Sequence, residues 1–251
     1  MQAVLYVAHG SRVEEGVEEA IDFIERSKPF IDVPIQEICF LELAAPNISE
    51  GIATCVARGA SKVAVVPILL LTAHHAKRDI PLEIEAGKIR YPHVVFTYGE
   101  TFGVHTKIVD SLFDRLLEQD ATFDENSSVL LIGRGSSDQA VKRDLGHIAQ
   151  LLSEKYAIQQ VDICFLYGSK PSFDEALWEL QQTNLKQIFI IPYLLFSGIL
   201  MNDIEKKVIK QSTNNQRYTL CENLGYHKNI QEVLVERVNE LLKRSVIKQA
   251  I

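Results

Sequence analysis

The chain of 251 residues is acidic, with 26 Lys and Arg against 33 Asp and Glu, and 47% of its residues are hydrophobic. This length and composition allow a large buried core, which excludes a disordered, collagen-like or disulfide-scaffold protein. The acidic balance argues against nucleic acid and anionic membranes as partners. Charged residues interrupt every apolar run well short of a membrane span. No secretory signal is visible, so we expect a cytoplasmic protein with reduced cysteines.

Three stretches of sequence recur in the same order at one offset of 125 residues. The matching pairs are VLYVAHGS at 4–11 and VLLIGRGS at 129–136, ICFLELAAP at 38–46 and ICFLYGSKP at 163–171, and VAVVPILL at 63–70 and IFIIPYLL at 188–195. Three matches at one offset indicate two copies of one unit. We therefore expect two domains, 1–122 and 123–251. A helix that crosses between the copies would move this boundary by several residues.

Short apolar runs in the first copy predict its strands. They are rich in β-branched residues and too short for typical helices, which is typical of strands buried on both faces of a parallel sheet. The runs lie at 3–8, 34–40, 62–71 and 94–98.

Helical patterns alternate with these runs. Apolar residues at i, i+3, i+4 and i+7 predict helices around 17–24, with Ile21 on the apolar face, and around 109–116. Glu50, three residues after Asn47, and Glu175, three residues after Ser172, predict capped helix starts at Asn47 and Ser172, and Pro81 marks an early position of a further helix. The order βαβαβαβα in each copy predicts an α/β fold of two similar, doubly wound parallel-sheet domains with a cleft between them.

The carboxyl ends of the strands are where an open parallel sheet binds its ligand, and there the two copies differ. His9, Glu42 and His75 follow three predicted strands of the first copy. The corresponding residues of the second copy are Arg134, Tyr167 and Leu200. Two imidazoles and a carboxylate suit a borderline divalent metal and could also accept protons. Each alone has a plainer explanation as a surface loop residue, but their occurrence at one sheet edge favours a site.

The turns after the first strand of each copy could bind an anion. Ser11 and Arg12 follow His9, and Ser136 and Ser137 follow Arg134 closely. Backbone N–H groups and a guanidinium at such a turn can hold a carboxylate or phosphate. The alternative is a tight strand-to-helix turn with capping serines. The common nucleotide-binding glycine motifs are absent from the sequence, so nucleotide binding has no support.

On these residues the chain resembles the class II tetrapyrrole chelatases, and most closely the two-domain sirohydrochlorin ferrochelatases of bacteria. The motifs that carry the resemblance are His9-Gly10-Ser11-Arg12, Phe40-Leu41-Glu42-Leu43 and His75-Ala76-Lys77-Arg78-Asp79-Ile80-Pro81. The resemblance covers nearly the whole chain. It implies a lyase without a prosthetic group that inserts Fe²⁺ into sirohydrochlorin without ATP, giving sirohaem. One departure is His74, where the family pattern expects a small residue.

The resemblance also implies roles for the site residues. His9 and His75 would bind the metal and accept protons, with Glu42 as their carboxylate partner. Sirohydrochlorin carries many carboxylates, which Arg12 and the turn from Arg134 to Ser137 could help to hold. An upstream dehydrogenase could supply this substrate.

Other functions stay open. Relatives that insert Co²⁺ or accept Ni²⁺ share the pattern, so the motifs do not distinguish between these metals. A non-catalytic tetrapyrrole or metal carrier would need the cleft but no proton transfer. A hydrolase has little support, since the sequence holds no G-x-S-x-G motif.

Overall fold

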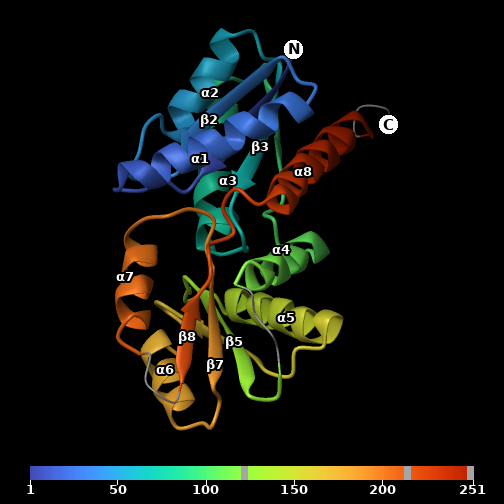
Figure 1. Cartoon of the computed structure of the whole chain (residues 1–251). Helices are drawn as coiled ribbons and strands as arrows, with labels where there is room; N and C mark the ends of the chain where they lie inside the picture. The colour runs from blue at the N-terminus through green and yellow to red at the C-terminus, as the bar shows by residue number, and fades with distance from the viewer. Residues whose placement is uncertain (120–123, 212–215, 248–251) are drawn as a thin grey trace. The chain divides into compact units, whose positions relative to one another are not determined.

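The computed structural model describes residues 1–119, 124–211 and 216–247 and contains two parallel sheets in an α/β fold (Figure 1). The strand orders are β2-β1-β3-β4 and β6-β5-β7-β8. The strands are β1 (Gln2–Ala8), β2 (Ile35–Phe40), β3 (Lys62–Ile68), β4 (Val95–Tyr98), β5 (Ser127–Gly133), β6 (Val161–Phe165), β7 (Gln187–Tyr193) and β8 (Arg217–Leu220). The predicted fold of two similar parallel-sheet domains is confirmed.

The helices alternate with the strands, as the order βα predicted. They are α1 (Glu14–Ser27), α2 (Ile48–Ala57), α3 (Ile80–Arg90), α4 (Thr106–Leu117), α5 (Gln139–Tyr156), α6 (Phe173–Gln181), α7 (Ile199–Val208) and α8 (Lys228–Ile247). A short 3₁₀ helix follows α1 at Lys28–Phe30, and a π-helical turn precedes α3 at His75–Asp79.

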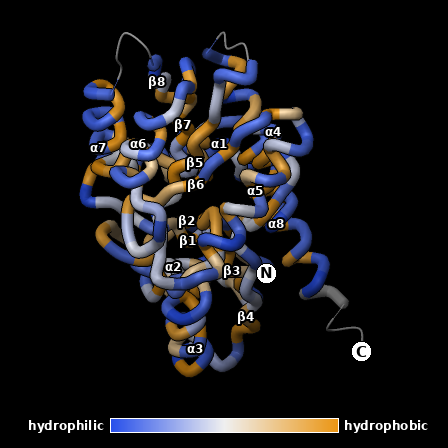
Figure 2. The backbone as a smooth tube through the Cα atoms, turned by 90° about the horizontal axis from the view of Figure 1, so that it is seen from below, coloured by the Kyte–Doolittle hydropathy of each residue, from blue (hydrophilic) through white to orange (hydrophobic). Residues whose placement is uncertain are grey.

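The strands form the core of each domain. Every residue of β5 is buried, and so is every residue of β1 after Gln2. In Figure 2 the hydrophobic colour follows the strands, whereas the helices alternate between hydrophobic and hydrophilic segments. Helices cover both faces of a doubly wound sheet, so its central strands need apolar side chains in both directions. This explains why the central strands read as continuous apolar runs.

The starts of α2 and α6 confirm the predicted caps. Asn47 accepts a hydrogen bond from the Glu50 N–H, and the Glu50 carboxylate accepts one from the Asn47 N–H. Ser172 and Glu175 repeat this capping box. Because each box pairs two N–H groups that a helix start leaves open, it fixes where the helix begins.

The last helix of each copy belongs to the compact unit of the other copy. One unit comprises Met1–Gly103 with α8 from Gln231, and the other comprises Val104–Ile230. Within the second unit the Phe113 ring of α4 stacks on Tyr156 of α5, with centroids 3.7 Å apart. Within the first, Gln231 of α8 donates to the Arg26 carbonyl of α1. The predicted boundary at 122 and 123 lies outside the described residues.

The cysteines are all buried free thiols. Their identities are Cys39, Cys55, Cys164 and Cys221. No helix among the described residues has the length and apolar character needed to cross a membrane.

Candidate metal centre

His9, Glu42 and His75 meet at the carboxyl edge of the first sheet because β1 lies between β2 and β3. His9 directly follows β1, and Glu42 follows β2 by two residues. The parallel pairing continues past both strands, since the Glu42 N–H donates to the His9 carbonyl over 3.1 Å. His75 begins the π-helical turn that follows β3. Three separate loops thus bring these side chains together.

The glycine after His9 allows this close approach. Gly10 has φ +90°, and a Cβ at this position would lie 1.8 Å from the Glu42 carbonyl oxygen. Only glycine adopts this backbone conformation without strain and leaves that space empty. The second copy has the same turn, where a Cβ on Gly135 would lie 1.7 Å from the Tyr167 carbonyl oxygen. The turn is therefore a feature of both copies. Only in the first copy does it bring a histidine and a carboxylate, His9 and Glu42, close together.

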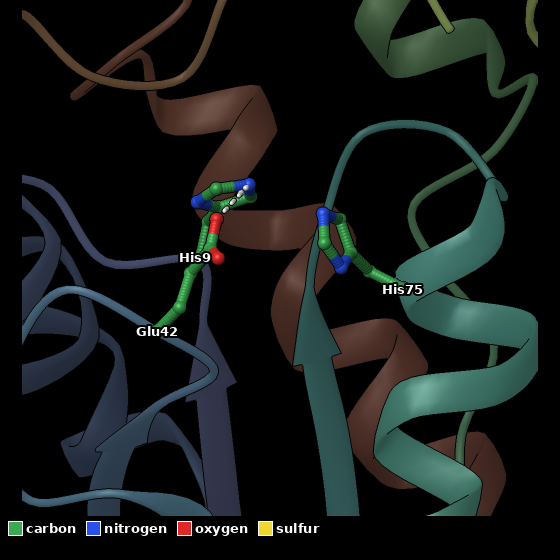
Figure 3. A group of neighbouring side chains, drawn as sticks. All are labelled: His9, Glu42 and His75. Carbon is green, nitrogen blue, oxygen red and sulfur yellow. Dashed lines mark ion pairs between the residues drawn. The ribbon is translucent and has the colours of Figure 1, made fainter. Parts of the chain in front are cut away.

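The three side chains can share one metal ion. One potential ligand atom from each of His9, Glu42 and His75 lies within 4.8 Å of the other two. His9 Nε2 is 3.5 Å from Glu42 Oε1, and the two imidazole rings meet edge to face with centroids 5.1 Å apart (Figure 3). The side chains of His9 and Glu42 are partly exposed, 28% and 43%, although the His9 Nε2 atom itself is buried.

Hydrogen bonds determine which nitrogen each imidazole offers. His9 Nδ1 lies 3.2 Å from the Gly10 carbonyl oxygen, and His75 Nδ1 lies 2.8 Å from Asp79 Oδ2. Both contacts are satisfied when Nδ1 carries the proton, because a carbonyl oxygen and a carboxylate only accept, and each Nε2 then has a lone pair to offer a metal ion. This tautomer orients an imidazole to bind metal through Nε2.

Asp79 is a site residue that was not predicted as one from the sequence, where it is only part of the motif from His75 to Pro81. It lies four residues after His75 in the π-helical turn, where the wider turn brings both side chains to one face. Short π-helical segments occur frequently at functional sites. The available signal was the His-x-x-x-Asp spacing, which also occurs on any helix surface.

A hollow of about 520 Å³ lies beside Glu42 and His75, within the first unit. Its lining combines carboxylates with apolar side chains: Leu41, Glu42, Asn47, Ile48, Ser49, His75, Asp79, Leu82 and Glu83. A negatively charged lining attracts cations and repels carboxylates. The hollow therefore suits the approach of a metal ion better than a carboxylate-rich ligand.

The predicted anion-binding residues lie outside the group of His9, Glu42 and His75, which we call the metal set. Ser11 Oγ accepts from the Val13 N–H, and Ser136 Oγ accepts from the Asp138 N–H, over 3.0 and 3.1 Å. Both serines thus stabilise their own turns. The other three, Arg12, Arg134 and Ser137, are exposed.

Three further histidines lie just before helical segments and are not part of the metal set. His74 is exposed, while its neighbour His75 takes part in the set. His105 and His227 cap α4 and α8, where each Nδ1 accepts a backbone N–H.

Fold and site together define a two-domain α/β protein with an open His, His and carboxylate metal set at the edge of one sheet. The chain belongs to the CbiX family, which it matches twice, over residues 3–119 and 128–241. The two matches agree with the repeat in the sequence.

Named relatives extend over most of the chain. A sirohydrochlorin ferrochelatase of Priestia megaterium is 52% identical, over 96% of this chain and 91% of the relative. A sirohydrochlorin cobaltochelatase of the same organism is 39% identical, over 98% of this chain and 82% of the relative. The structure of SirB from Bacillus subtilis with Fe³⁺ is similar at a TM-score of 0.89 and 45% identity, covering 96% of this chain and 95% of that one. The predicted resemblance to sirohydrochlorin chelatases is confirmed.

Proposed function

We propose that the protein is a lyase that inserts Fe²⁺ into sirohydrochlorin without ATP, with the metal as a substrate. The observation that carries this proposal is the set of His9, Glu42 and His75, whose ligand atoms lie within 4.8 Å of one another. Three ligands leave coordination positions open, so the ion can exchange and move on. The ferrochelatase that is 52% identical over nearly the whole chain supports the same reaction.

The residues of the first unit would act in sequence. The Nε2 lone pairs of His9 and His75 replace water on the incoming ion, and the Glu42 carboxylate offsets part of its charge. When the ion passes to the four macrocycle nitrogens, two pyrrole N–H protons must leave. The departing metal frees both imidazole lone pairs, which can then accept these protons. The charge at the site stays balanced, since two protons replace one divalent cation.

We propose that the second copy contributes to substrate binding and not to metal chemistry. Its exposed Arg134 can donate two hydrogen bonds to a carboxylate of sirohydrochlorin. Ser136 and Ser137 follow on the same turn, and Ser11 and Arg12 occupy the matching turn of the first copy. A separate dehydrogenase would supply the tetrapyrrole. The buried free thiols fit a cytoplasmic location.

Cobalt insertion is the second candidate, and the cobaltochelatase that is 39% identical favours it. Imidazole and carboxylate ligands accept Fe²⁺, Co²⁺ and Ni²⁺, so the three side chains do not choose between them. The competing non-catalytic function is a tetrapyrrole or metal carrier.

An absorbance assay separates these functions. Purified protein, sirohydrochlorin and either Fe²⁺ or Co²⁺ are mixed in anaerobic buffer without nucleotide, and metallation is followed over the uncatalysed rate. Faster insertion of Fe²⁺ than of Co²⁺, at equal concentrations, supports the ferrochelatase. Binding of sirohydrochlorin without acceleration of either reaction would show a carrier.

A further inference from the structure

Tyr98 contacts the turn that carries His75, although its side chain belongs to no part of the metal set. It is the last residue of β4, and its hydroxyl donates a 2.8 Å hydrogen bond to the carbonyl oxygen of Ala76. Burial raises the pKa of Tyr98, so the hydroxyl keeps its proton and remains a donor. The backbone beside His75 is thereby held by a neighbouring strand end.

The Ala76 carbonyl needs this donor because the local backbone does not supply one. In a regular α-helix the Ile80 N–H would donate to Ala76, but here it donates to the His75 carbonyl. In the π-helical pattern the donor to Ala76 would be residue 81, and Pro81 has no N–H. Ala76 is buried, only 5% exposed, and a buried carbonyl requires a partner. The Tyr98 hydroxyl provides it.

The second copy offers an internal comparison. There α7 begins as an ordinary α-helix, without the π-helical turn. Strand register pairs Val65 with Tyr98 in the first sheet and Ile190 with Leu220 in the second. The residues that replace His75, Asp79, Pro81 and Tyr98 are Leu200, Ile204, Lys206 and Leu220. The tyrosine, the proline and the π-helical turn thus occur together in the copy that has the histidine and are missing together in the other.

We propose that Tyr98 is a positioning residue for metal delivery, which holds His75 in its binding orientation through the Ala76 carbonyl. The inference rests on the proposed role of His75 as a metal ligand. Without the hydroxyl, the turn loses the bond that compensates for its displaced hydrogen-bond pattern. The direction in which the His75 side chain leaves the backbone then varies, and Nε2 spends less time near His9 and Glu42.

The test is Tyr98→Phe in the full chain, with Co²⁺ alone as the probe and its visible absorption as the signal. Outer-shell partners typically change metal affinity by 10- to 100-fold, and we expect a loss of about 10-fold here because Tyr98 acts through the backbone. In the insertion assay the KM for the metal rises, whereas the KM for sirohydrochlorin stays the same. The matched control is Tyr6→Phe, which removes the 2.6 Å hydrogen bond from a buried tyrosine to Gln36. It leaves Co²⁺ affinity unchanged.

A His75→Ala background shows whether Tyr98 acts through His75. There, Tyr98→Phe causes no further loss of the remaining Co²⁺ affinity, because the ring that it positions is gone. An equal loss in both backgrounds, wild-type affinity in Tyr98→Phe, or no Co²⁺ binding by the wild type would overturn the inference. Positioned metal binding without insertion into sirohydrochlorin would instead overturn the proposed function and leave the inference standing.

Discussion

Asp79 Oδ2 lies 2.8 Å from His75 Nδ1, and this bond directs the other nitrogen of His75 toward His9 and Glu42. Removing the carboxylate with Asp79→Ala should lower Co²⁺ affinity by about 10- to 100-fold, because the ring loses the partner that sets its tautomer and orientation. Asp79→Asn retains an oxygen acceptor and should lose less. Titration with Co²⁺ measures both, and wild-type affinity in Asp79→Ala would show that the bond has no such role.

The matching turns at Gly10 and Gly135 allow effects on metal binding to be distinguished from effects on the stability of the fold. Alanine at either position must tolerate a positive φ and a contact below 2 Å with a backbone oxygen. We expect each to lower the free energy of unfolding by about 2–5 kcal/mol, measured by urea denaturation. Only Gly10→Ala should also weaken Co²⁺ binding by the folded protein, since it moves His9 relative to Glu42. Equal weakening by Gly135→Ala would contradict this assignment.

Arg134 should matter for substrate affinity and not for the chemical step. Its contact to a carboxylate would persist from the bound substrate to the transition state, so its loss raises KM and leaves kcat nearly unchanged. Arg134→Ala should raise the KM for sirohydrochlorin by about 10-fold or more, as expected for a hydrogen bond to a charged group. Arg143→Ala removes another exposed arginine, on α5, and serves as the control. An unchanged KM in Arg134→Ala would show that Arg134 does not bind the substrate and is only a residue of the turn.

His227 should make the fold sensitive to acid. Burial lowers the pKa of His227 below its usual 6.5, although Asp114 lies 3.1 Å away and partly opposes the shift. The unfolded chain therefore takes up the proton more readily than the folded one. The stability that neutral His227 confers is present above about pH 6.5 and is lost as the pH falls below that value.

Replacement of His227 by Asn tests this pH dependence. Asparagine can still cap α8, but it does not titrate. Urea unfolding midpoints between about pH 5 and 7, a range that spans the ordinary imidazole pKa of about 6.5 and the region below it, should vary less in His227→Asn than in the wild type. His147→Asn, at an exposed position of α5, should keep the wild-type slope. An identical slope in His227→Asn would refute the prediction.

Local patterns were sufficient to predict the strands, the caps and the three residues at the first sheet edge. Asn47 and Ser172 begin their helices as predicted, because capping depends on residues three apart in sequence. The apolar run at 62–71 predicted too long a strand, since β3 ends at Ile68 and its last residues enter the loop toward His75. Ile21 was assigned to the buried face of α1 but is 37% exposed, and Phe23 is buried there.

Two other features that depend on contacts between distant residues could not be predicted in full. The sequence allowed for a helix that crosses between the copies, but it did not show that α4 and α8 both change units, because both helices keep the amphipathic spacing that either sheet would accept. The π-helical turn shifts the hydrogen-bond register by one residue, so the pairing of Ala76 with Tyr98 appears only in three dimensions.

The central claim is that His9 and His75 bind the metal and pass it to the tetrapyrrole. The most direct measurement is the rate of Fe²⁺ insertion into sirohydrochlorin by the His9→Ala and His75→Ala variants, singly and combined, with sirohydrochlorin binding measured in parallel. We predict that each variant loses insertion while retaining tetrapyrrole binding. Undiminished insertion by the double variant, relative to the wild type, would contradict the account.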